Sequence, residues 1–312
     1  MNQGQPTRDG ALVWHYTNAA GLHGIILGNS VRATSAAFMN DAHEMQSGRD
    51  AFAKLFKARE AELDLAAQDR IRRSGIMGSA SPFSNFLLSA STDPDSLTLW
   101  RNYGGSEVAY SIGLERDAPL SPVAQSLEDA HPKPPADYYE PDWEEVGDGD
   151  RHNNNQNPDY ELVLGGRWTD VSYISGPDDP EIVRRFESLI VEEIGKRGLL
   201  SFPAYALSNS PTDFMKHLGF ADEKEVRSVT WVSPDWKFVL HRPSRFGLIP
   251  YIELTGAEGG EHFAAQPNPL PIRQITIGPN PLSEHAKRSL RVFLDANGYG
   301  DVEIFVSETP FR

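Results

Sequence analysis

The 312-residue sequence contains no cysteine. Disulfide bonds and thiolate nucleophiles are therefore excluded, and a zinc site would need histidine and carboxylate ligands. No apolar run approaches the roughly 20 residues that a membrane-spanning helix needs, and residues 1–12 lack the charged and apolar blocks of a signal peptide. We therefore expect a soluble cytoplasmic protein that has no membrane partner.

Basic residues are scarce, with 29 Lys and Arg against 44 Asp and Glu and a formal net charge of -15. Non-specific binding to nucleic acid needs a broad basic surface, so we do not expect such binding. The composition still allows a local basic site. Several familiar motifs are also missing: GxGxxG after a strand, GxxxxGK[ST], HExxH and GxSxG. The usual dinucleotide, phosphate-loop, zinc-protease and serine-hydrolase signatures are thus absent.

The residues that are present predict one globular domain over residues 1–312, since 39% of them are apolar. Strands are expected at 11–16, 31–34, 86–88, 108–114, 171–174, 223–232, 237–240, 248–254, 275–278 and 301–306. Helices are expected at 19–27, 42–71, 180–196 and 284–297. Strict strand–helix alternation is lacking, which favours an α+β fold. The proline-rich, acidic residues 115–160 are interpreted as a surface insertion, partly disordered.

The stretch Asn85–Gly105 is a candidate pocket wall. Its apolar run leads into Ser89 and Ser91, and a strand that ends in hydroxyls can hold hydrogen-bond donors at the lip of a pocket. Trp100, Arg101 and Tyr103 follow, offering stacking surface and an anion partner. A core strand, a turn and a packed helix end would explain the same pattern equally well.

Two further candidates lie near the amino terminus. His15, Tyr16 and Thr17 end the first strand, where a histidine can hydrogen-bond a ligand hydroxyl while the backbone holds its other ring nitrogen. Asn40-Asp41 and Glu44 share one face of the following helix, which could form a metal site. The alternatives are a half-buried histidine beside a helix cap and, at Asn40-Asp41, an N-cap with acidic residues in the first turn.

The last candidate is the sequence from Glu223 to Arg227. In a strand, residues two apart face the same side, so Glu223, Glu225 and Arg227 would form a row. Two adjacent carboxylates raise one pKa, which Arg227 can offset, and such a pair can stabilise a developing cation while orienting a nucleophile. The alternative is a solvated edge strand with a surface ion pair.

Taken together, these short motifs occur in the same order as in a bacterial domain-of-unknown-function family, family 2971, which the chain resembles over nearly its whole length apart from 115–160. The motifs are His15-Tyr16-Thr17, Asn40-Asp41 with Glu44, Ser89-x-Ser91, Trp100-Arg101-x-Tyr103-Gly104, Glu223-x-Glu225-x-Arg227, Ile277-Gly278-Pro279 and Ser307-x-x-Pro310-x-Arg312. That family is in turn remotely similar to the ADP-ribosyltransferase superfamily.

The remote resemblance implies a mixed, mainly antiparallel split sheet flanked by helices. It also implies that His15, with Tyr16 and Thr17 beside it, binds the ribose of NAD, and that Ser89 and Ser91 or Tyr103 line the nicotinamide pocket, with Arg101 adjacent. Glu225 would stabilise an oxocarbenium-like transition state, and Glu223 would position the acceptor.

The leading hypothesis is therefore an NAD-consuming ADP-ribosyltransferase or NAD glycohydrolase, by family analogy a toxin or anti-phage effector. NAD would be its substrate, no metal would be needed, and the acceptor, protein or nucleic acid, is open. One alternative is a non-enzymatic sensor that binds a nucleotide or protein through Trp100–Tyr103. The other is a metal-dependent phosphoesterase or nuclease that uses Asp41, His43 and Glu44, with Arg101 on phosphate.

Overall fold

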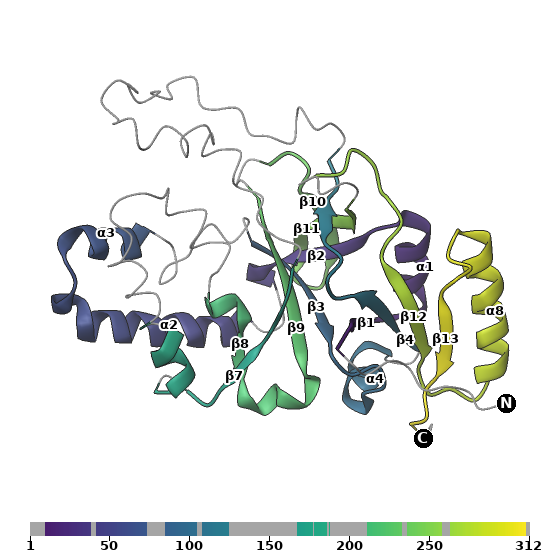
Figure 1. Ribbon diagram of the computed structural model, residues 1–312, viewed down its shortest axis with the longest axis horizontal. Coiled ribbons are helices and arrows are strands. Elements are labelled where there is room, and N and C mark those ends of the chain that lie inside the picture. Colours follow the sequence, from purple (N-terminus) through teal and green to yellow (C-terminus); the bar gives the residue numbers. More distant parts are fainter. Residues whose placement is uncertain are drawn as a thin grey trace.

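One large sheet organises the part of the chain that the computed structural model describes, namely residues 10–38, 42–73, 85–104, 108–124, 167–176, 178–185, 187, 211–232, 236–257 and 263–309. Its main path is β10-β11-β2-β3-β1-β4-β12-β13, while β5 pairs with β11, β9 with β3, and β6 with β9 (Figure 1). Among these strand pairs only β12 and β13 are parallel. The predicted α+β class with a mixed, mostly antiparallel sheet is confirmed; the likeness to ADP-ribosyltransferases stays a prediction.

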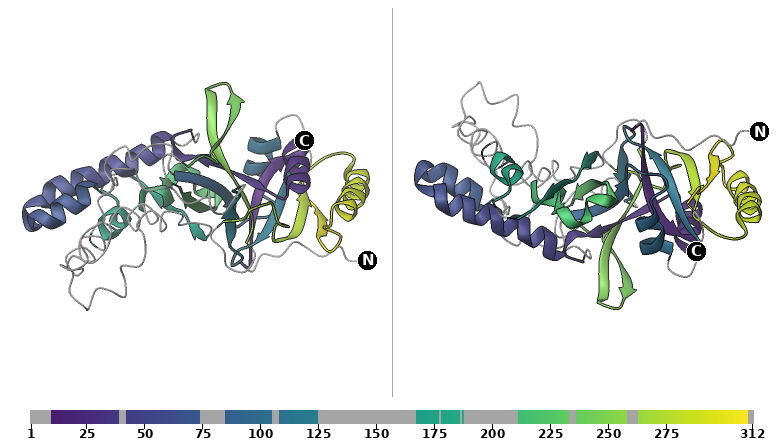
Figure 2. Two further views of the ribbon diagram at one scale, coloured as in Figure 1. Left: turned by 90° about the horizontal axis from the view of Figure 1, so that it is seen from above. Right: turned by 90° about the horizontal axis from the view of Figure 1, so that it is seen from below.

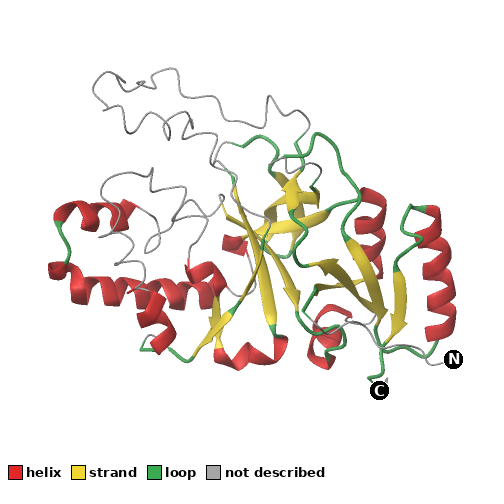
Figure 3. Cartoon of the chain, viewed as in Figure 1, coloured by secondary structure: helices red, strands yellow, loops and turns green. Residues whose placement is uncertain are grey.

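The strands of this sheet are β1 (Leu12–Asn18), β2 (Val31–Ser35), β3 (Asn85–Ser91), β4 (Ala109–Glu115), β5 (Leu120–Pro122), β6 (Trp168–Asp170), β9 (Glu225–Trp231), β10 (Leu240–Ser244), β11 (Gly247–Gly256), β12 (Ile272–Ile277) and β13 (Glu303–Val306). A separate parallel pair consists of β7 (Ser172–Ile174) and β8 (Met215–His217). The helices are α1 (Ala19–Gly28), α2 (Ala42–Arg59), α3 (Leu65–Arg73), α4 (Leu97–Gly104) and α8 (Ser283–Ala296), with 3-10 turns η1 (Ala36–Phe38), η2 (Glu60–Glu62), η4 (Pro211–Phe214) and η5 (Leu218–Glu223) (Figure 3).

Alternation along β1 gives the sheet two different faces. Val13 belongs to the main apolar core, together with residues of α1 and α8 such as Ile26 and Leu294. Its neighbour Trp14 packs instead with Leu99 and Trp100 of α4. Because successive side chains of a strand point to opposite faces, α4 covers one face of the sheet and α1 and α8 cover the other.

A smaller apolar cluster lies at the opposite end of the molecule from α8 (Figure 1). It joins Phe52 of α2 and Ile71 of α3 to Ile174 of β7 and Met215 of β8. These elements lie beside β9. They bring residues from widely separated parts of the chain to one edge of the sheet face that α4 covers, called the α4 face below.

The predicted helix 42–71 is wrong in one respect, because it is two helices. The chain leaves α2 after Arg59, and the carboxylate of Asp64 accepts a hydrogen bond of 2.6 Å from the amide of Ala67. An aspartate that satisfies a free amide in this way starts a new helix. The first helix of the chain begins as expected, with the side chain of Asn18 accepting from the amide of Gly21 at 2.9 Å.

Part of the predicted insertion at 115–160 needs a correction. Strand β5 lies within it and pairs with β11, and Leu120 and Ala124 are buried in the main core. Pro122 is compatible with β5 because, among the strands that the structure describes, this short strand pairs with β11 alone, so a missing N–H is tolerated. Residues 125–160 lie outside the described residues, as does the predicted helix 180–196 beyond residue 187; residues 180–185 and 187 are helical.

Candidate functional site

The strand register gathers the predicted polar residues on the α4 face. Glu225 of β9 pairs with Ser91 of β3, and Arg227 pairs with Ser89. On the other edge of β3, Trp14 of β1 pairs with the same Ser91. Directly paired residues point to the same face. Since Trp14 lies under α4, all five side chains belong to that face.

Glu225 and Arg227 form a buried ion pair. Their side chains are 6% and 1% exposed. Arg227 Nε donates to Glu225 Oε1 at 2.8 Å, and its Nη2 donates to Oε2 at 3.1 Å, which is the two-pronged contact that a guanidinium makes best. A third donor, Arg227 Nη1, is fixed by the carbonyl of Asp213 at 2.9 Å. The interpretation of this strand as a solvated edge is wrong, because β9 lies between β3 and β6.

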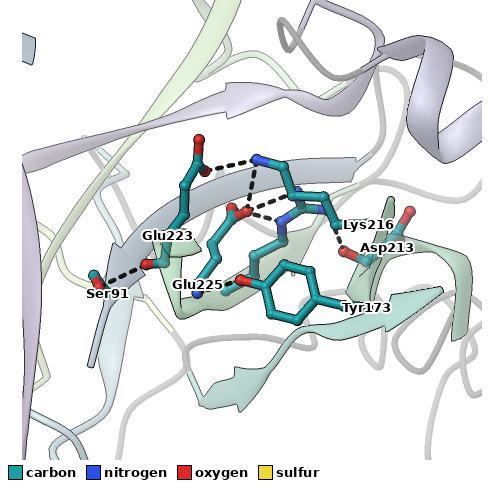
Figure 4. Close-up of polar contacts among 7 residues, drawn as sticks. Ser91, Tyr173, Asp213, Lys216, Glu223 and Glu225 are labelled. Carbon is teal, nitrogen blue, oxygen red and sulfur yellow. Dashed lines mark hydrogen bonds and ion pairs between the residues drawn. The ribbon is translucent and has the colours of Figure 1, made fainter. Parts of the chain in front are cut away.

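Lys216 of β8 joins the two glutamates. Its Nζ lies 2.8 Å from Glu223 Oε2 and 3.2 Å from Glu225 Oε2, and its side chain is 4% exposed (Figure 4). The ammonium also lies 4.8 Å from the centre of the Phe220 ring. Two carboxylates and, with Arg227, two cations thus share one site and balance in charge.

These cations keep Glu225 ionised. Burial alone would raise the pKa of this carboxyl, but attraction to Arg227, the hydrogen bonds from Arg227 and attraction to Lys216 outweigh burial and hold the pKa below its ordinary value. A carboxylate of this kind is a weak base at neutral pH. It is suited to holding a hydroxyl or facing a positive charge.

The backbone around Glu225 is held by hydroxyl groups. The Glu225 amide donates to the Tyr173 hydroxyl at 2.7 Å, and the Ser91 hydroxyl donates to the Glu223 carbonyl at 2.7 Å. Between them Lys224 has a left-handed backbone, with φ of 46°, so the strand begins only at Glu225. The predicted row of Glu223, Glu225 and Arg227 on one strand is therefore wrong for Glu223, which ends η5 and reaches Lys216 from there.

A pocket opens directly beside this charge cluster. It has a volume of about 260 Å³ counting the part that is open to solvent. Its lining comes from β1, β3, α4 and the η5–β9 junction, and consists of Trp14, Tyr16, Ser89, Ala90, Ser91, Leu99, Tyr103, Glu223 and Glu225. Tyr103 is 47% exposed and its ring centre lies 6.3 Å from that of Tyr16. One wall is thus aromatic and the facing wall carries hydroxyls and carboxylates.

His15 does not line this pocket. It alternates with Trp14 and Tyr16 along β1, and its Nδ1 lies 2.9 Å from the carbonyl oxygen of Ser89, within hydrogen-bonding distance. That carbonyl lies between the short stretches where β2 and β1 pair with β3, so the imidazole bridges a gap in the ladder. Burial lowers the pKa of His15, an effect that the hydrogen bond to Ser89 partly offsets.

The neighbours of His15 have separate roles. The Tyr16 hydroxyl donates to the Asp93 carbonyl at 2.7 Å and accepts from the Ser96 amide at 2.9 Å, so only its ring faces the pocket. Burial raises the pKa of Tyr16. Thr17 pairs with Tyr110 of β4 and is half-buried outside the pocket lining.

Two candidate residues of the Trp100 motif remain: Trp100 is packed in the protein and Arg101 is exposed. Trp100 donates from Nε1 to Asp95 at 2.7 Å, and the same carboxylate accepts from the Ser307 hydroxyl and the Glu308 amide. The carboxyl-terminal motif is thereby attached to the turn before α4. Arg101 is exposed on α4 and is not among the pocket residues.

Most of the residues proposed for a metal site lie outside the part of the chain that the structure describes. Asn40 and Asp41 are outside the described residues, as are the side chains of His43 and Glu44. Within the described ranges, no group of three or more His, Asp or Glu residues could hold a metal ion. In the same ranges, no helix has the length and apolarity required to cross a membrane.

Sequence reasoning missed Lys216, Tyr173 and Trp14. Lys216 and Tyr173 belong to the short β7–β8 pair, and nothing in their local sequence distinguishes a lysine that contacts the Glu225 carboxylate or a tyrosine that contacts its amide. Trp14 had a usable signal in the sequence. It precedes His15 in the same strand, and successive side chains of a strand point to opposite faces, so only one of the two residues could line a given pocket.

In comparisons with known proteins, no family model, curated protein or solved structure matches this chain. The predicted relationship to family 2971 and to the ADP-ribosyltransferases therefore stays a prediction.

Proposed function

We propose that this protein is an NAD-consuming ADP-ribosyltransferase or NAD glycohydrolase whose reaction takes place at the Glu225 pocket. The observation that carries the proposal is a buried, ionised glutamate that lines the same pocket as an exposed tyrosine ring and two serines from another strand. Cleavage of an N-glycosidic bond creates positive charge on the ribose, and a fixed carboxylate beside the ribose stabilises that charge.

The chemistry of the lining suits one end of a dinucleotide, because it combines an exposed tyrosine ring with serine hydroxyls and a carboxylate. Tyr103 would stack on the nicotinamide ring, and Ser89 and Ser91 lie on the opposite wall near its amide group.

The reaction then has a simple balance. The bond between ribose and nicotinamide breaks, and its electron pair leaves with nicotinamide, which becomes neutral. Glu225 faces the resulting oxocarbenium, while Arg227 and Lys216 hold the carboxylate in place. Water or an acceptor nucleophile attacks the same carbon and releases a proton. Glu223 is 18% exposed at the rim and is the group placed to orient that nucleophile.

The test is release of nicotinamide from NAD by wild-type protein and by Glu225→Gln. We expect the substitution to reduce the rate by about 100-fold or more, since it removes electrostatic stabilisation of the transition state. Glu115→Gln is the matched control, because Glu115 is a partly exposed carboxylate paired with Arg273 elsewhere in the sheet. Absence of nicotinamide release by the wild type, with water or with added acceptors, would refute the proposal.

A second substitution tests the aromatic wall without disturbing the core. Tyr103→Ala should weaken NAD binding about tenfold, since stacking of a base on an aromatic ring contributes roughly 1–3 kcal/mol. Leu97→Ala is its control, as Leu97 is 43% exposed on the same helix and does not line the pocket.

One observation favours a second candidate, a nucleotide-binding sensor without turnover. Both carboxylate oxygens of Glu225 already accept hydrogen bonds from Arg227 and Lys216. On this hypothesis NAD or a related nucleotide binds to the wild type, Glu225→Gln retains binding, and neither protein releases nicotinamide.

A further inference from the structure

A two-stranded ribbon projects from the body of the protein (Figure 2). In the strand order of the sheet, β2 separates it from β3, which lines the pocket. The ribbon consists of β10 and β11, joined by a turn at Arg245 and Phe246. Strand β11 pairs with β2 only from Tyr251 to Leu254, so the segment from Gly247 to Pro250 pairs with β10 alone among the described strands. Four residue pairs therefore extend beyond the pairing with β2 by roughly 13 Å, and the outer two, at Gly247 and Leu248, are exposed while Ile249 and Pro250 are buried.

The projecting part of this ribbon and the residues just before it carry a charge opposite to that of the whole protein, whereas Glu253 lies farther along β11, where that strand pairs with β2. From Trp236 to Ile252 the sequence contains no aspartate or glutamate, although the chain carries a net charge of -15. The same stretch contains Lys237, His241, Arg242 and Arg245, of which all but Arg242 are exposed. The buried Nε of Arg242 has no hydrogen-bond partner among the described residues.

Large apolar side chains are exposed beside these cations. Phe246 is 62% and Leu248 66% exposed, and the guanidinium carbon of Arg245 lies 4.6 Å from the centre of the Phe246 ring. The turn beneath them is held by Ser244, whose hydroxyl donates to the Gly247 carbonyl and accepts from the Phe246 amide. An arginine and an aromatic ring are thus presented together on a tightly built tip.

We infer that this ribbon binds duplex DNA by entering the major groove. That groove is about 12 Å wide and 8.5 Å deep and admits a two-stranded ribbon. Arginine at the tip recognises guanine edges, an apolar ring contacts the thymine methyl group, and exposed Lys237, just before β10, meets a phosphate. The binding surface is separate from the proposed NAD pocket and does not depend on the activity of that pocket.

Two other kinds of occupant fit the ribbon less well. A partner strand added to the edge would need donors from β10, yet Pro243 lies in that edge strand and has no N–H. A lipid surface would bury a wider apolar patch than Phe246 and Leu248 at the tip, and the next exposed apolar residue of the ribbon, Leu240, sits at its base opposite Tyr251.

The test is fluorescence anisotropy of a short labelled mixed-sequence DNA duplex at low salt. We expect saturable binding that weakens as salt rises, and Lys237→Glu with Arg245→Glu should weaken it about tenfold or more. The matched control is Lys54→Glu with Arg288→Glu, which makes the same charge change at exposed positions on α2 and α8 and should weaken binding by less than about twofold.

Phe246→Ala is an independent variant whose affinity for the duplex should be lower than that of Val292→Ala on α8. Val292→Ala is the control because Val292 is 70% exposed. Circular dichroism verifies that all variants are folded. Duplex RNA should bind more weakly than duplex DNA, since the major groove of A-form RNA is too narrow for the ribbon. The inference is overturned if the wild type does not bind the duplex, if both charge-reversed proteins lose affinity equally, if RNA binds as tightly as DNA, or if phosphatidylserine vesicles bind and DNA does not.

Discussion

Strands β3 and β9 carry opposite chemistry on their two faces. On one face Leu88, Ala90 and Val226 belong to the main apolar core. On the other face, the same strands carry Ser91, Glu225 and Arg227. Burying a paired charge costs desolvation energy that the ion pair often fails to recover, so a buried ion pair is weak evidence for stability. The apolar face therefore holds the strands together, and the charged face is better explained by a ligand.

This comparison predicts that removing one charged side chain lowers the free energy of unfolding more than removing apolar surface does. Arg227→Met should lower the free energy of unfolding by about 3–5 kcal/mol, because the carboxylate of Glu225 then stays buried with Lys216 as its one cationic partner among the described residues. Denaturant unfolding followed by circular dichroism measures the loss.

The matched control removes the pair as a whole. Glu225→Gln combined with Arg227→Met should recover most of that stability, since no uncompensated charge remains beside the methionine. A single Arg227→Met variant that unfolds within about 1 kcal/mol of the wild type would mean that the charged face is solvated rather than buried.

The apolar face should respond next most strongly. Leu88→Ala should lower the free energy of unfolding by about 3 kcal/mol, because Leu88 is 1% exposed and its truncation leaves a cavity. We expect the loss to be independent of pH and nicotinamide release to be unchanged under conditions where the variant is folded. A loss of activity in the folded variant would show that the two faces are coupled.

Glu225→Gln should cost about 2 kcal/mol at neutral pH, less than Arg227→Met, because the amide oxygen still accepts a hydrogen bond from Arg227. The pKa of Glu225 lies below its ordinary value in the folded protein, so its stabilising effect is complete above pH 4.5 and is lost as the pH falls through the folded pKa. Urea unfolding at several pH values should show the difference between variant and wild type shrinking in acid. A constant difference would contradict an ionised Glu225.

The smallest effect is expected at His15, on the opposite face from Glu225. His15→Asn should lower the free energy of unfolding by about 1 kcal/mol at pH 8. The asparagine amide is an imperfect replacement for the imidazole as donor to the Ser89 carbonyl. Burial lowers the pKa of His15, so wild-type stability is complete above 6.5 and declines as the pH falls below that value. The asparagine variant should lack this decline, as thermal unfolding between pH 5 and 8 would reveal. If NAD affinity falls along with stability, His15 acts on the ligand as well as on the sheet.

The sequence was sufficient where local patterns decide structure. Alternation predicted β1 and the placement of Glu225 and Arg227 on one face, and the helix expected at 19–27 was found as α1. Prediction failed where a local signal competed with tertiary packing. Prolines around residue 119 suggested an exposed insertion, but Leu120 carries apolar surface into the core.

The sequence by itself determined that Glu225 and Arg227 share a face, because residues two apart on a strand must do so. It could not determine that β9 pairs with β3, or that Lys216 arrives from β8 to bridge Glu223 and Glu225. Those contacts join residues that are far apart along the chain or lie on separate short strands. Their energy comes from burial and strand register, which exist only after the whole sheet has formed, so the tertiary structure alone decided which of the predicted residues meet in one pocket.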